Sequence, residues 1–138
     1  MSYELLDHTA DVKFRAVGSS REEAFSEAVK AFAEIVGSDP EAGEVRHTIE
    51  VESESFDALL FDFLDELIFL QDTEDVAVCH AEDLELEEGD THRLKTVVWT
   101  QTIVSGMDLL DIKAPTYNEM KTDYKKGEGW ILEAVLDI

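Results

Sequence analysis

The stretch FDALLFDFLDELIFLQDTE, residues 56–74, decides the fold because it predicts a helix at the centre of the domain. At 3.6 residues per turn it makes about five turns. A wide apolar stripe follows one side of these turns and consists of Phe56, Leu59, Leu60, Phe63, Leu64, Leu67 and Ile68. Acidic side chains occupy the remaining surface, at Asp57, Asp62, Asp65 and Glu66.

Segments that are predicted to form strands precede and follow this helix in the sequence. Residues 45–52 alternate apolar and polar side chains with the period of a half-buried strand, and His47 falls on the inward side. A lone inward histidine is more often a packed residue than a ligand. After the helix, residues 76–81 and 84–86 predict strands that lead through an acidic turn into a long return strand over 94–103.

The two ends of the chain also predict strands. At the start, DHTAD joins strands expected over residues 3–8 and 12–17. A capping box formed by Ser20 and Glu23 then begins a helix that Gly37 ends.

Near the other end, we expect a short strand over 112–114 that leads through Pro115 into TYNEMK. The turn KKGEG then opens a last strand over 130–138. Two helices among six or seven strands, several of them in hairpins, predict an α+β fold. We expect a mixed, mainly antiparallel sheet with both helices packed on one face, in a single domain over residues 1–138.

The composition is strongly acidic. The chain holds 33 Asp and Glu residues against 11 Lys and Arg, which gives a formal net charge of −22. Such a surface repels nucleic acid, so we expect no direct nucleic-acid binding, although Lys13, Arg15 and Arg46 could form a local basic patch. A folded, lysine-poor acidic chain fits a halophilic cytoplasm, where high salt screens the repulsion. Because acidic residues are so common in this chain, a single carboxylate is weak evidence for a functional site.

Other features limit the compartment and the chemistry. The first residues do not resemble a signal peptide and no segment is apolar enough to span a membrane, so we expect a cytoplasmic protein. The apolar run VAVCHA predicts that Cys79 is a small buried residue rather than a nucleophile. The signatures of nucleotide-binding loops, serine hydrolases, zinc sites and EF-hand calcium loops are all absent from the sequence.

The strongest candidate for a site lies at the chain's end. The Asp137 side chain and the terminal carboxylate of Ile138 would be two anions close together, which is costly unless a cation or strong donors lie between them. If the last strand lies beside the first, this end could meet Asp11. Three carboxylates around one point would suit a hard divalent ion such as Ca²⁺. An exposed acidic terminus with solvated carboxylates is the alternative.

Four segments together resemble the archease family: YELLDHTADVKF, LLFDFLDELIFLQDTE, IKAPTYNEM and WILEAVLDI. The resemblance spans essentially the whole chain. It implies a non-enzymatic protein cofactor in tRNA splicing, which activates the RtcB-type RNA ligase by promoting its guanylylation and multiple turnover. It also implies an acidic metal site with Asp11, Asp137 and Ile138 as ligands, for Ca²⁺ first and Mg²⁺ or Mn²⁺ as alternatives.

The resemblance further suggests His8, Asp65 and Lys113 as residues that contact the ligase. Lys113 is either a surface lysine or a charge that reaches the ligase or its nucleotide phosphate. Asn118 stands where members of the family commonly have histidine.

Two other functions stay open. One is a metal-dependent phosphoester hydrolase with His8 as general acid or base. The other is a chaperone or specificity factor for a tRNA-modifying enzyme.

Overall fold

The computed structural model describes residues 1–6 and 11–138. In this part of the chain it contains two helices and seven strands. In chain order these elements are β1 (Ser2–Leu6), β2 (Asp11–Gly18), α1 (Arg21–Val36), β3 (Val45–Ser53), α2 (Phe56–Glu74), β4 (Val76–Glu88), β5 (His92–Thr102), β6 (Ala114–Lys125) and β7 (Gly129–Asp137).

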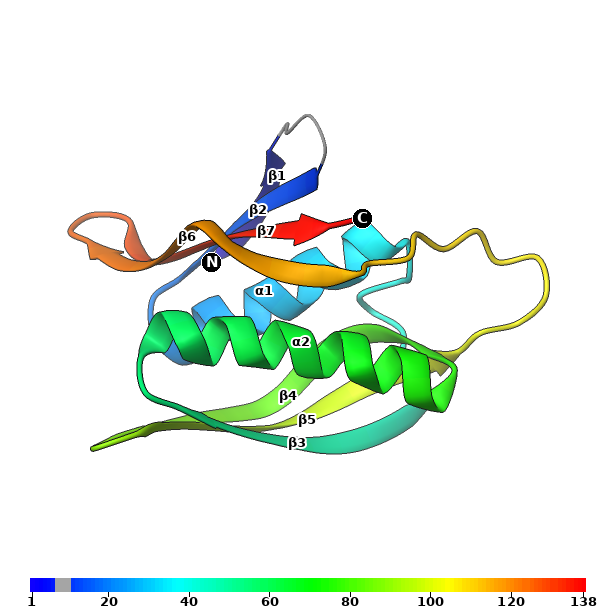
Figure 1. Ribbon diagram of the computed structural model, residues 1–138, viewed down its shortest axis with the longest axis horizontal. Helices are drawn as coiled ribbons and strands as arrows, with labels where there is room; N and C mark the ends of the chain where they lie inside the picture. Colours follow the sequence, from blue (N-terminus) through cyan, green and yellow to red (C-terminus); the bar gives the residue numbers. More distant parts are fainter. Residues whose placement is uncertain (7–10) are drawn as a thin grey trace.

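The strands form two sheets with the helices between them (Figure 1). Sheet A has the order β1-β2-β7-β6 and sheet B the order β3-β5-β4. Every strand pair in the described residues is antiparallel. The predicted α+β class is therefore confirmed, whereas the single sheet with helices on one face is replaced by two sheets that cover the helices from both sides.

The central helix explains this layered arrangement. α2 has the bounds predicted for it, and its Leu59, Leu60, Phe63, Leu64 and Leu67 are fully buried. A stripe this wide presents more apolar surface than one sheet can cover, so α2 packs against β6 of sheet A and also against all three strands of sheet B.

Serine side chains cap both helices at their N-termini. Ser20 accepts a hydrogen bond from the backbone N–H of Glu23 at 3.1 Å, as the capping box predicts. The Glu23 carboxylate accepts the backbone N–H of Ser19 at 2.7 Å, one residue before the N-cap. Ser55 caps α2 in the same way, by accepting from the backbone N–H of Ala58.

The C-terminal half differs from the prediction in where its strands begin and end. β4 is one strand over the two expected pieces, and a register shift between Glu82 and Glu85 falls at the expected break. A second register shift lies between Val78 and His80. The short strand expected over 112–114 is wrong for residues 112–113, which lie outside the strands, because β6 begins at Ala114 and continues through Pro115. Proline is tolerated because β6 is an edge strand, where one side of the backbone has no neighbour to pair with.

His47 and Cys79, both predicted to face the interior, lie on strands of sheet B. His47 is half-buried on β3. Cys79 is fully buried, as expected, and burial raises the pKa of its thiol to about 11. None of the described helices is long and apolar enough to cross a membrane.

Candidate functional site at the strand ends of sheet A

Asp11 and Asp137 lie directly opposite each other in the antiparallel pair of β2 and β7. Opposite residues of such a pair point to the same face of the sheet, with Cβ atoms about 5 Å apart. Like charges in this position destabilise a sheet unless another group offsets them. The structure therefore brings together the early aspartate and the last aspartate, although the last strand pairs with the second strand and not with the first.

The start of β6 reaches the same place from the other side of β7. Ala114 lies opposite Asp137, and the backbone N–H of Lys113 donates to the Asp137 carbonyl oxygen at 2.8 Å. The backbone of Lys113 is thus fixed beside the end of β7, while its side chain is exposed. Ile138 follows directly and is 39% exposed.

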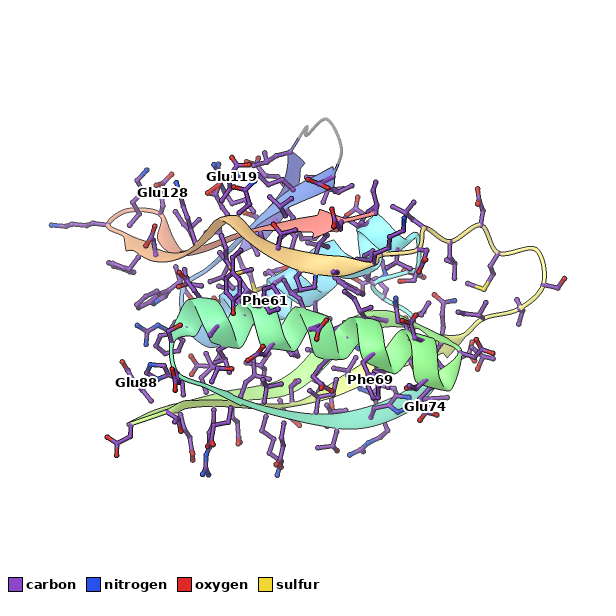
Figure 2. The ribbon with its side chains drawn as sticks, in the orientation of Figure 1. Phe61, Phe69, Glu74, Glu88, Glu119 and Glu128 are labelled. Carbon is purple, nitrogen blue, oxygen red and sulfur yellow. The ribbon has the colours of Figure 1, made fainter. Side chains whose placement is uncertain are left out.

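A chain of ion pairs continues from this site across the same face of sheet A. Lys13 lies two residues from Asp11 and therefore on the same face of β2. Its Nζ lies 3.4 Å from the Glu119 carboxylate and 3.7 Å from that of Glu133. Glu119 rises from β6 on the side away from α2 (Figure 2). Arg15 pairs with Glu133 at 3.3 Å.

This network was not predicted from the sequence. The signal that could have found it is the two-residue spacing of Asp11, Lys13 and Arg15, which places all three side chains on one face of a strand. Glu119 could not have been found in this way, because it lies in a break of the β6–β7 register between Thr116 and Lys121. It adopts a left-handed backbone conformation with φ of 59°.

Among the described residues, the predicted partner contact Asp65 does not lie at this site. Asp65 is exposed on α2, a different element from the strand ends. His8 lies outside the described residues. The expected basic patch is wrong, because Arg46 lies on β3 in sheet B whereas Lys13 and Arg15 lie on β2 in sheet A.

The donors at the strand ends are all oxygens, which is what Ca²⁺ and Mg²⁺ prefer. Among residues 1–6 and 11–138 there is no cluster of three His, Cys, Asp or Glu side chains suited to a metal. The expected ligand set consists of two aspartate side chains and one main-chain carboxylate. It fits a hard cation by its chemistry.

The buried Cys79 thiol, with its raised pKa, stays protonated at neutral pH and is a poor nucleophile. The acidic groups at the strand ends can hold a cation or present negative charge to a partner.

The fold and this site define a small α+β protein in which two sheets enclose two helices and acidic groups meet at the strand ends. The family model described as the Archease protein family (MTH1598/TM1083) matches residues 3–138. The chain belongs to the archease family, as the sequence motifs suggested.

Its relatives and structural neighbours cover nearly the whole chain. It is 36% identical to a protein archease of Pyrobaculum neutrophilum over 99% of this chain and 95% of that protein. It is 33% identical to an archease-like protein of Drosophila melanogaster over 88% of this chain and 80% of that protein. The solution structure of Methanobacterium thermoautotrophicum protein 1598 superposes with a TM-score of 0.82 at 28% identity, covering 99% of this chain and 98% of that one.

A crystal structure from Thermotoga maritima, described as an archease and possible chaperone, shares the fold. Its TM-score is 0.65 at 23% identity, and the match covers 96% of this chain and 94% of that one.

Proposed function

We propose that this archease is a non-enzymatic protein cofactor that activates an RtcB-type RNA ligase in tRNA splicing. It would promote guanylylation and repeated turnover of the ligase through a divalent-metal site at the ends of β2 and β7. The observation that carries this proposal is the pairing of Asp11 opposite Asp137.

In this proposal the Asp11 and Asp137 carboxylates and the terminal carboxylate of Ile138 hold the cation, Ca²⁺ first and Mg²⁺ or Mn²⁺ as alternatives. The bound ion would supply positive charge at a position where the strand register forces like charges together. Lys113 is held beside the site by its backbone hydrogen bond to Asp137, so its exposed side chain can extend toward the ligase or a phosphate.

A protein partner suits this chain better than RNA. The net charge of −22 opposes phosphate binding over most of the surface. The Thermotoga maritima relative is described as a possible chaperone, which is also a role exercised on a protein. A transient complex with the ligase is the form of contact that we expect.

The test is a multiple-turnover RNA ligation assay with purified ligase. We expect Asp11→Asn and Asp137→Asn each to reduce the stimulated turnover at least tenfold. The matched control is Asp123→Asn, an exposed aspartate of the same sheet that lies opposite Ile131 instead of another acid. It should retain stimulation within about twofold.

Full stimulation by both strand-end variants would remove the basis of the proposal. Incubation of the archease alone with Mg²⁺ or Ca²⁺ and phosphodiester or phosphomonoester substrates separates activator from hydrolase. We expect no turnover without the ligase.

A further inference from the structure

The solvent-exposed side of α2 alternates acidic and aromatic residues one helical turn apart. Asp57, Phe61, Asp65 and Phe69 follow each other at intervals of four residues, so their side chains form one row along the helix. Figure 2 shows Phe61 and Phe69 on this helix. Neighbours in such a row have Cβ atoms about 5–6 Å apart.

The aromatic members of this row present a large surface to solvent. Phe69 is 60% exposed, although the chain is otherwise strongly acidic on its outside. The Phe61 ring stacks on Tyr117 of β6, with ring centres 4.2 Å apart and planes within 5° of parallel. Tyr117 is itself 56% exposed. We call Phe61, Phe69 and Tyr117 the α2 aromatic face.

Some carboxylates around the α2 aromatic face accept a hydrogen bond from a neighbouring side chain, and others have no such partner within the described residues. Asp57 accepts the Thr122 hydroxyl at 2.5 Å, and Asp62 accepts the Ser53 hydroxyl at 2.5 Å. Asp65, Glu66 and Asp72 are exposed and make no ion pair or side-chain hydrogen bond within the described residues. On the helix, Asp65 and Glu66 lie about one turn before Phe69, and Asp72 lies about one turn after it.

The geometry points to a docking surface on α2 for a protein segment that carries arginine or lysine beside apolar side chains. A guanidinium can stack on an exposed ring while its N–H groups bind a neighbouring carboxylate, and the spacing of the row offers both within one helical turn. Partial burial and the nearby carboxylates of Asp62 and Asp57 raise the pKa of Tyr117. The negative charge of these carboxylates would also favour a basic partner.

This inference goes beyond the proposed function. It concerns a helix that lies outside the strand-end site, and it holds whether or not Asp11 and Asp137 bind a metal. A basic partner is favoured over an apolar one because unpaired carboxylates flank Phe69, and burial of these charges without cations would be costly. RNA is disfavoured because its phosphates would meet the same carboxylates.

The test measures binding of a synthetic amphipathic helical peptide that presents arginine and leucine on one face. Titration is followed by amide chemical shifts in about 0.5 M KCl, which weakens general attraction to an acidic protein. We expect the shifts to map to residues 61–73 and to Tyr117. We expect Phe69→Ala, and separately Asp65→Asn with Glu66→Gln, to weaken binding at least fivefold.

The matched control is Glu85→Gln with Glu87→Gln on β4, which removes two exposed charges from sheet B. It should change the affinity less than twofold.

Three results would overturn the inference. The first is an equal loss of affinity in the β4 control, which would show general charge attraction. The second is dimerisation of the protein that depends on Phe69 in sedimentation velocity, which would assign the face to a second copy. The third is displacement of the peptide by tRNA bound to α2. Ligase stimulation is a separate readout, so failure of this inference is distinguishable from failure of the proposed function.

Discussion

The Tyr3 hydroxyl shows how single residues tie the outer strand of sheet A to the helices. It donates a hydrogen bond to the Glu34 carboxylate, which joins β1 to α1. This hydrogen bond, followed by partial burial and by the charges of Glu34 and Glu27, raises the pKa of Tyr3 to about 12. The protonated phenol is therefore the form that the folded state prefers.

The consequence is a loss of stability at high pH. Because the folded pKa lies above the ordinary value of 10.0, the contribution of Tyr3 is complete below pH 10 and is lost as pH rises toward 12. We expect Tyr3→Phe to lower the free energy of unfolding by about 1 kcal/mol at neutral pH. Solvent screening keeps the effect at this low end because the group is only half-buried.

Chemical denaturation measures the stability change. In an absorbance titration of the tyrosines, Tyr3→Phe should remove the group that titrates at the highest pH. Tyr124→Phe is the control, since Tyr124 is 59% exposed. An unchanged titration curve in Tyr3→Phe would contradict the assignment.

An arginine between two aromatic rings connects the starts of both helices with sheet A. The Arg21 guanidinium lies 3.8 Å from the Phe56 ring centre and 4.2 Å from that of Trp130. His92 stacks on Phe56 at 4.2 Å, which extends the contact to sheet B. Arg21 also pairs with Glu88 at 3.3 Å.

We expect Arg21→Ala to lower the free energy of unfolding by about 1–2 kcal/mol, because two partly desolvated cation–π contacts and their packing are lost together. Arg93→Ala is the matched control, since Arg93 is a mostly exposed arginine paired with Glu52 on sheet B. Its loss should be at most about 1 kcal/mol. Urea unfolding of both variants makes the comparison, and equal losses would contradict the role of the rings.

The helices were predictable from sequence because their determinants are local. The apolar stripe gives the bounds of α2, and the serine and glycine caps give those of α1. The division of strands into two sheets was not predictable, because pairings such as β2 with β7 join residues more than a hundred positions apart. The meeting of Asp11 with Asp137 could be stated only as conditional on such a pairing.

Charge is unevenly divided over the protein. The segments 1–18 and 113–138, which contain the strands of sheet A, hold six of the 11 basic residues and eight of the 33 acidic ones. The helices, sheet B and their connections hold the rest. Nearly all of the net negative charge therefore belongs to the part of the molecule outside sheet A, and the strand-end site lies in the part that is close to neutral.

This imbalance predicts stabilisation by salt. Self-repulsion among the carboxylates should fall as KCl rises from 0.1 to 2 M, because the screening length drops from about 10 Å to below about 3 Å. We expect the midpoint of thermal unfolding to rise by several degrees, as followed by circular dichroism. A variant with several neutralised acids in sheet B should respond less. A midpoint that falls or stays constant over this range would contradict the prediction.

We expect the acidic groups that meet at the ends of β2 and β7 to bind a divalent cation. Calorimetric titration of Ca²⁺ into the wild type, Asp137→Asn, Asp123→Asn and a chain extended by a few residues beyond Ile138 tests it most directly. We predict one site in the wild type and in Asp123→Asn, with affinity at least tenfold lower in Asp137→Asn and in the extended chain. Equal affinity in all four proteins, or no binding to the wild type, would contradict the claim.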